Sequence, residues 1–183
     1  MIYEFLAEGF EEIEALCPLD ILRRAGIEIS AVSVNDNLFV TGAHGITFKA
    51  DKTAKDISFD KLCGIILPGG MPGTLNLEKS EIVNKLTDSC AEKGLLIAAI
   101  CAAPSIIGKK GLLKDKKATC FTGFEKYLIG AKTVDTPVVR DGNIITARGA
   151  GAAFDFAYEI VSFINNGKTA DKLSADMKYP LRG

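Results

Sequence analysis

The chain has 183 residues, of which 48% are hydrophobic and 25% charged, and its net charge is −1. These values suit one soluble globular domain over residues 1–183, with a sizeable core. They argue against a nucleic-acid-binding surface, and no apolar run is long enough to span a membrane. Because no basic segment followed by a long apolar core opens the chain, we expect no signal peptide and a cytoplasmic location.

Five cysteines occur, at positions 17, 63, 90, 101 and 120. Their number is odd and no pair has C-x-x-C spacing, so neither a disulfide framework nor a zinc site is indicated. Cys17, Cys63 and Cys90 lie on core-facing patterns and are expected to be packed thiols. We expect no metal and no cofactor. His44 is the one histidine, which matters because most cysteine hydrolases need a histidine.

The first third of the chain alternates between strand-like and helix-like patterns. A short apolar strand is followed by a turn at Gly9 and by a helix with acids in its first turn, where the helix dipole favours them. Pro18 should kink or break this helix, and Gly26 should cap it. A second strand and a glycine-centred hairpin follow. The predicted ranges are 2–6, 11–25, 27–34, and 38–40 paired with 46–48.

The rest of the chain continues the alternation. A polar connection precedes a third buried strand, a loop dense in glycine and proline, and two helical segments closed by Gly94. A central strand and its helix come next, then a short strand, a small helix ending near Gly130, a hairpin and two final helices. The predicted ranges are 51–59, 62–67, 68–73, 75–77, 82–90, 95–100, 118–121, 138–140, 144–147, 152–164 and 168–178.

This order of elements predicts a doubly wound α/β sandwich with a mainly parallel sheet covered by helices on both faces. Sites in such sheets lie beyond the carboxyl ends of the strands. Three loops, over residues 7–14, 68–73 and 101–103, should therefore meet at one edge.

Cys101 stands at the corner of a predicted strand, sharp turn and helix. The run Leu95–Ile100 is unbroken and apolar, as in a strand buried on both faces, and Pro104 suits the first turn of a helix. The geometry is that of a G-x-S-x-G nucleophile elbow, with alanines in place of the glycines. A helix amino end should lower the thiol pKa below its free value of roughly 8.5. The alternative on this stretch alone is a buried core cysteine.

Glu14 and a pair of glycines are the candidate partners of Cys101. Glu11 and Glu12 are expected to serve the helix dipole, whereas an inward Glu14 would have a raised pKa and could exchange a proton with sulfur. Gly69 and Gly70 could offer backbone N–H groups to an oxyanion, or could simply form a turn that needs positive φ. A glycine loop at 149–151 lacks the full G-x-G-x-x-G pattern, so no dinucleotide site is expected.

Four motifs resemble one known family. Gly9–Glu14, Leu67–Gly70, Ala98–Pro104 and Thr146–Gly151 together resemble the ThiJ/PfpI superfamily, most closely its parkinsonism-associated deglycase branch, often called DJ-one. The resemblance implies a flavodoxin-like fold, a homodimer and an oxidation-prone cysteine at the elbow. Carried over by motif, Cys101 is the reactive cysteine and Glu14 is its carboxyl partner. Gly70 and Ala102 are the backbone donors.

Two departures from the superfamily concern histidine. The protease-like branch has a histidine directly after the cysteine, where this chain has Ala102, and the stretch 119–122 has none either. A Cys–His dyad within one subunit is therefore not expected, which argues against a peptidase. His44 could reach the site only across a dimer interface or through an unexpected hairpin fold, and we expect it to be simply exposed. Arg24 is the other possible cross-dimer contributor.

Two functions are considered, and the first is what the resemblance implies. In the first, the Cys101 thiolate attacks the aldehyde carbon of a small dicarbonyl such as methylglyoxal, giving lactate without glutathione or metal, or acts on the corresponding protein adducts. In the second, the protein is an oxidative-stress sensor or chaperone that uses reversible oxidation of Cys101. A role in thiazole synthesis, a label sometimes attached to relatives, finds no support in these residues.

Overall fold

A mainly parallel sheet of seven strands forms the centre of the protein. The computed structural model describes residues 1–179, so the last four residues of the predicted domain lie outside it. The strand order is β10-β11-β7-β6-β1-β2-β5, and only the β10–β11 pair is antiparallel. The strands are β1 (Ile2–Leu6), β2 (Ile29–Ser33), β5 (Lys52–Thr53), β6 (Gly64–Leu67), β7 (Leu96–Ile100), β10 (Val138–Asp141) and β11 (Ile144–Ala147).

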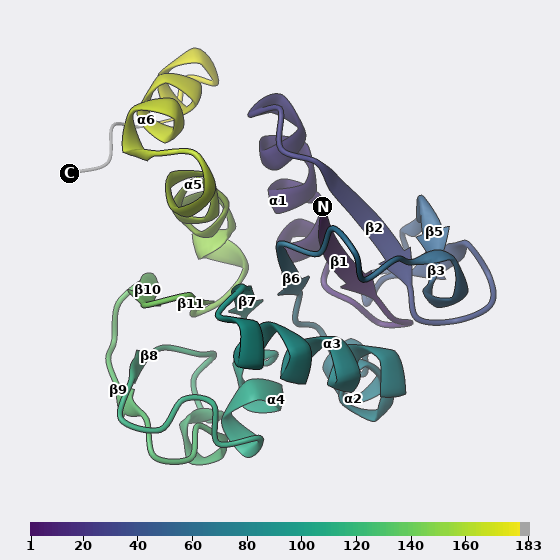
Figure 1. Cartoon of the computed structure of the whole chain (residues 1–183), viewed down its shortest axis with the longest axis horizontal. Helices are drawn as coiled ribbons and strands as arrows, with labels where there is room; N and C mark the ends of the chain where they lie inside the picture. The colour runs from purple at the N-terminus through teal and green to yellow at the C-terminus, as the bar shows by residue number, and fades with distance from the viewer. Residues whose placement is uncertain (180–183) are drawn as a thin grey trace.

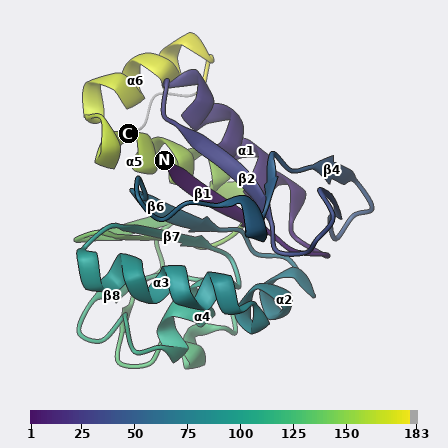
Figure 2. The same cartoon turned by 45° about the vertical axis from the view of Figure 1, so that its right-hand side comes forward.

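Helices cover both faces of the sheet, as Figures 1 and 2 show. One face carries α1 (Glu12–Arg24), α5 (Ala153–Ile164) and α6 (Gly167–Asp176). The opposite face carries α2 (Gly73–Lys79), α3 (Glu81–Lys93) and α4 (Pro104–Lys109). Within the described residues, no helix combines the length and the apolar character needed to cross a membrane.

Two small sheets and three short 3₁₀ helices complete the described chain. They are β3 (Phe39–Thr41) with β4 (Thr47–Lys49), β8 (Lys117–Ala118) with β9 (Lys132–Thr133), and the 3₁₀ helices η1 (Ala54–Asp56), η2 (Glu125–Tyr127) and η3 (Ala150–Ala152).

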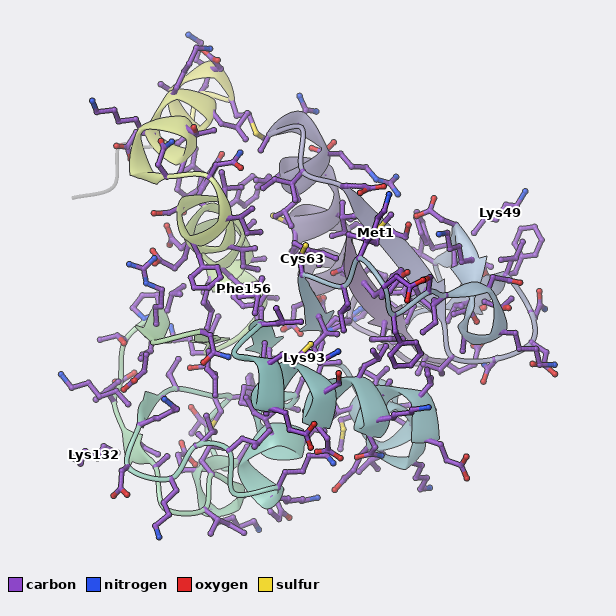
Figure 3. All side chains as sticks on the ribbon, viewed as in Figure 1. Met1, Lys49, Cys63, Lys93, Lys132 and Phe156 are labelled. Atoms are coloured by element: carbon purple, nitrogen blue, oxygen red, sulfur yellow. The ribbon has the colours of Figure 1, made fainter. Side chains whose placement is uncertain are left out.

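Strand β7 is buried on both faces, which explains its unbroken apolar sequence. It pairs in parallel with β6 on one side and β11 on the other. Ile97 and Ala99 pack on the α3–α4 side, while Ala98 and Ile100 pack on the α1–α5 side. Figure 3 shows the same inward packing for Phe156 of α5, which is fully buried. The residue that follows β7 therefore leaves the middle of a rigid sheet.

The predicted fold class is confirmed, and most predicted elements are present. The polar connection over 51–59 also contains an edge strand, β5, and α1 continues unbroken through Pro18. The predicted strand over 118–121 ends at Ala118, because the next residues turn toward the end of β7, where the Phe121 N–H bonds to Cys101. The small helix expected to end near Gly130 is only the 3₁₀ turn η2.

Candidate active site

Cys101 sits at a sharp elbow between β7 and α4. Its φ is +64°, a left-handed conformation that costs a non-glycine residue about 1–2 kcal/mol. Two backbone hydrogen bonds hold the elbow: the Cys101 N–H donates to the Ala147 carbonyl and the Phe121 N–H donates to the Cys101 carbonyl, both at 2.8 Å. The predicted strand–turn–helix arrangement is therefore present, with the half-buried thiol at its corner.

Glu14 comes from the first turn of α1 and points at this thiol. Its side chain is 1% exposed and hydrogen-bonds to Cys101. The Gly69 N–H donates to Glu14 Oε2 at 2.9 Å, and the Ala150 N–H also donates to the carboxylate. Glu11 caps the helix by accepting the Glu14 N–H at 2.7 Å. The position of Glu14 is thus fixed from three segments of the chain.

Burial controls the protonation of Glu14. Loss of hydration raises the pKa of the carboxyl to about 7, against the lowering effect of its hydrogen bond with Cys101. The negative charge of Glu11 raises the pKa further, and the amides of Gly69 and Ala150 lower it. A group with this pKa exists in both forms near neutral pH, as a proton donor or acceptor requires.

The Cys101 thiol differs from the sequence-based expectation. Burial raises its pKa, and the charge of Glu14 and their hydrogen bond raise it further, although the amides of Ala102 and Gly70 lower it. The predicted lowering was wrong because burial and the charge of Glu14 outweigh the groups that lower the pKa; α4, the helix after the elbow, is only six residues long and begins three positions after Cys101. When Glu14 holds the proton, its charge disappears and it can donate a hydrogen bond to sulfur, so the two groups titrate as a pair.

Two glycines let the chain pass close to this pair. A Cβ on Gly69 would lie 2.6 Å from Glu14 Oε2 and 2.7 Å from Cys101 Cβ. Gly70 has a φ of +89°, and a Cβ there would meet the Glu11 nitrogen. The Gly69 amide is used by Glu14, whereas the Gly70 and Ala102 amides face sulfur. Glycine is therefore required at both positions, because the backbone there passes too close to neighbouring residues to leave room for a Cβ atom.

The sequence did not indicate three backbone contributors: Ala147, Phe121 and Ala150 act through N–H or carbonyl groups, which carry no residue-specific signal. The motif at 149–151 was the available clue for Ala150, because a glycine loop often presents amides to an anion. Here that anion is the protein's own Glu14.

His44 and Arg24 make their hydrogen bonds away from Cys101. His44 is exposed, and its Nδ1 lies 2.7 Å from Glu12 Oε2, which raises the pKa of the imidazole. Glu12 also accepts the N–H groups of His44 and Ile46. Arg24 bonds to Asp20 at 2.6 Å, at the opposite end of α1 from Glu14.

A possible metal-binding geometry exists at the same place. The ligand atoms of Glu11, Glu12 and His44 lie within 4.8 Å of one another. Glu12, however, is buried and already accepts hydrogen bonds from the hairpin that connects β3 and β4. We therefore assign this cluster to fixing the hairpin on α1.

A cavity of about 830 Å³ lies beside the elbow. Cys101 and Glu14 do not line it, but Phe121 and Ala150 do, and the backbone N–H groups of these two residues bond to Cys101 and Glu14 respectively. Its other lining residues are Thr119, Cys120, Thr122, Glu125, Thr133, Val134, Asp135, Arg148, Gly149, Gly151 and Ala152.

The chain is similar to known proteins over nearly its whole length. The model of the DJ-1/PfpI family matches residues 1–163. Protein dj-1beta of Drosophila melanogaster is 36% identical over 157 residues, which are 85% of this chain and 84% of that protein. The solved structure titled "Toxoplasma gondii DJ-1, oxidized" has a TM-score of 0.93 at 32% identity and covers 98% of each chain.

Two further relatives carry activity names. The deglycase PfpI of Pyrococcus furiosus is 31% identical over 86% of this chain and 95% of its own length. The glutathione-independent glyoxalase DJR-1.2 of Caenorhabditis elegans is 30% identical over 91% of this chain and 89% of its own.

Proposed function

Because this chain belongs to the DJ-1/PfpI family, we propose that it is a cysteine-dependent glyoxalase or deglycase. It acts on small reactive dicarbonyls such as methylglyoxal, or on their protein adducts, without glutathione or metal. The names of its deglycase and glyoxalase relatives support the reaction class. The observation that carries the proposal is the buried Cys101–Glu14 pair, with two backbone amides facing sulfur.

The reaction begins with addition of the Cys101 thiol to the aldehyde group of methylglyoxal: Sγ bonds to the carbon and the thiol proton passes to the oxygen, which gives a hemithioacetal. Glu14 then takes the proton from that carbon and returns it to the neighbouring carbonyl carbon, while the hemithioacetal hydroxyl proton moves to the oxygen of that carbonyl, so the aldehyde carbon becomes a thioester. Water hydrolyses the thioester to lactate and frees the thiol. One water is consumed and one proton released, and no external oxidant or reductant is needed.

The Gly70 and Ala102 amides suit the oxygen that becomes negative when sulfur adds. They already face Cys101 in the free protein, so no reorganisation is needed at the moment of reaction. The pKa of about 7 for Glu14 allows the same group to accept a proton at one step and donate it at the next.

A second copy of the chain is the proposed partner. An apolar groove of about 400 Å³ lies along α1 and α5. Ile13 and Ile46, which line this groove together with Glu12, are 54% and 55% exposed, and Phe154 adds a third exposed apolar side chain. Covering such a face would remove apolar area from water.

Redox sensing is the second candidate function. The same amides and a protonated Glu14 could hold the oxygens of a sulfinate on Cys101, and one solved relative is titled as oxidized. Oxidation of Cys101 in stoichiometric amount, without turnover of a dicarbonyl, would favour this function over the first.

The decisive experiment measures lactate formed from methylglyoxal, without glutathione, by the wild type, Cys101→Ser and Cys17→Ser. We expect multiple turnovers that fall by at least about 10³-fold in Cys101→Ser, since the nucleophile is lost. Cys17→Ser is the matched control, because Cys17 is a partly buried cysteine in the middle of a helix. This variant should keep turnover within about twofold of the wild type. A folded, reduced wild type without turnover would contradict the glyoxalase proposal for this substrate.

A further inference from the structure

The cavity beside the elbow is much larger than methylglyoxal. That molecule has five heavy atoms and occupies only a few water volumes of about 30 Å³ each, whereas the cavity measures about 830 Å³. Pockets of this size usually hold ligands with ring-sized groups. The elbow therefore has room beside it for a substrate with a sizeable substituent.

Phe121 contributes an aromatic side chain to this cavity, and its backbone is hydrogen-bonded to the nucleophile's own residue. Its ring is 50% exposed, while its own N–H is bonded to the Cys101 carbonyl at 2.8 Å. The ring also lies beside Gly149, where a Cβ would be 3.4 Å from Phe121 Cδ2. An exposed aromatic ring is thus held at a fixed place next to the elbow.

The charged groups of the cavity are largely engaged. Glu125 Oε2 accepts the Gly123 N–H at 2.7 Å, and Arg148 lies 3.6 Å from Asp135. The arginine of the cavity is thus ion-paired and the Glu125 carboxylate is negative, so this lining does not favour an anionic substituent. The remaining polar groups are the hydroxyls of threonines, at positions 119, 122 and 133, which tolerate a neutral group.

We propose that Phe121 selects aryl α-oxoaldehydes, in which a planar aromatic group replaces the methyl group of methylglyoxal. The proposal rests on the glyoxalase function described above and specifies its substrate class. The aromatic group packs against the Phe121 ring while the aldehyde carbon meets Cys101. Sulfur adds to the aldehyde carbon, the proton on that carbon moves to the ketone carbon, and water releases a 2-aryl-2-hydroxy acid with one proton.

The kinetic test compares phenylglyoxal, which gives mandelate, with methylglyoxal. The measured quantity is the ratio of the two kcat/KM values in the wild type, Phe121→Ala, Phe121→Leu and Phe121→Tyr. We expect the wild type to favour phenylglyoxal and Phe121→Ala to lower the ratio about tenfold, as loss of aromatic packing predicts. Phe121→Leu should be intermediate, and Phe121→Tyr should keep the ratio.

Phe39→Ala is the matched control, because Phe39 is similarly exposed at 54% but lies on β3, outside the cavity lining. Its ratio should equal that of the wild type. A wild type that favours methylglyoxal, or a Phe121→Ala ratio equal to that of the wild type, would overturn the assignment of Phe121.

A binding measurement keeps the inference testable if the protein catalyses neither reaction. Titration calorimetry compares mandelate with lactate, both unreactive, on the wild type and Phe121→Ala. Tighter binding of mandelate than lactate by about tenfold, lost in Phe121→Ala, supports aromatic recognition even without turnover. Equal binding of the two acids by the wild type refutes it, whatever the outcome for catalysis.

Discussion

Two of the protein's cysteine–glutamate neighbourhoods differ in the backbone groups that surround the thiol. At the elbow, Cys101 meets Glu14. On the inner side of α1, the charge of Glu4 acts on Cys17. Glu4 lies in β1 and is fully buried, and neither carboxylate oxygen has a hydrogen-bond partner within the described residues.

The difference lies in the backbone donors. Cys17 is in the middle of a helix, and burial and the charges of Glu4 and Asp20 raise the pKa of its thiol to about 12. The pKa of the Cys101 thiol is also raised, by burial and by Glu14, and the amides of Ala102 and Gly70 offset this only in part. A nearby carboxyl is therefore common to both thiols, and what distinguishes Cys101 is the pair of backbone amides at a strand end, which can stabilise an oxyanion.

The carboxyl pKa shifts of three glutamates on neighbouring segments also depend on their hydrogen-bond donors. Burial raises the pKa of Glu4 well above its ordinary value, with Arg23 acting against this and Asp51 adding to it. Glu14, with two amide donors, has a pKa of about 7. Burial also raises the pKa of Glu12, but its hydrogen bonds from His44 and Ile46 outweigh this and leave the pKa lowered.

The largest difference between the two neighbourhoods is expected in kcat when the glutamate of each one is replaced. We expect Glu14→Gln to lower kcat for methylglyoxal by about 10²–10³-fold, since the amide cannot carry the proton. Glu4→Gln should change kcat less than about twofold, because Glu4 lies in the core. Steady-state kinetics with circular dichroism to confirm folding would test this, and an unchanged kcat in Glu14→Gln would remove Glu14 from the mechanism.

Pushing Glu14 away from Cys101 should have the next largest effect on kcat. In Gly69→Ala the new methyl group would push against Glu14 Oε2 and Cys101 Cβ, so we expect kcat to fall about tenfold or more. Gly167→Ala is the control, because a Cβ there would meet only Ser162 Oγ, at 3.8 Å. Full activity in Gly69→Ala would show that the close approach of the pair is unnecessary.

Replacing Glu4 should change stability and its dependence on pH. Both folded and unfolded chains hold the Glu4 proton at low pH. As pH rises past about 4.3 the unfolded chain ionises first, so the free energy of unfolding falls until the folded-state pKa is passed. Glu4→Met keeps the volume and removes the unpartnered carboxyl, so we expect it to raise the free energy of unfolding at pH 8 by about 1–3 kcal/mol.

Urea denaturation at pH 5 and pH 8 measures this effect. Because the pKa of Glu14 is also raised, part of the pH dependence should remain in Glu4→Met and disappear only when Glu14→Gln is added. A gain no larger at pH 8 than at pH 5 would contradict the account of Glu4.

The smallest expected effect concerns Glu12 and His44. The hydrogen bond between them raises the pKa of His44 above its ordinary value of 6.5. In Glu12→Gln the imidazole should titrate closer to that value, as measured by NMR of its ring protons. A His44 pKa that does not change in this variant would show that the pair is not formed in solution.

The fold could be predicted from the sequence because its main signals are local. The apolar run of β7 and the periodicity of α5 identify buried elements, and Gly94 has the left-handed φ expected of a helix cap. The segment after Ala118 could not be predicted in this way. Its course is set by a hydrogen bond between Phe121 and Cys101, which are distant in sequence.

The candidate site was predicted where a residue type or a motif marks it. Cys101, Glu14, the two glycines and Ala102 could be named from the sequence in this way. The pKa of Cys101 was not, because it depends on burial and on the charge of Glu14, and neither is readable from one strand and one helix. The cavity wall was also beyond prediction, since its residues come from several separate segments.

The link between Phe121 and the elbow has a consequence for how such an enzyme can diversify. Position 121 supports the nucleophile through its main-chain N–H alone, so any residue except proline can supply that support. Its side chain faces the cavity and has no part in holding Cys101. New substrate preferences can therefore arise by point substitution at position 121 while the geometry of the reacting thiol is inherited unchanged.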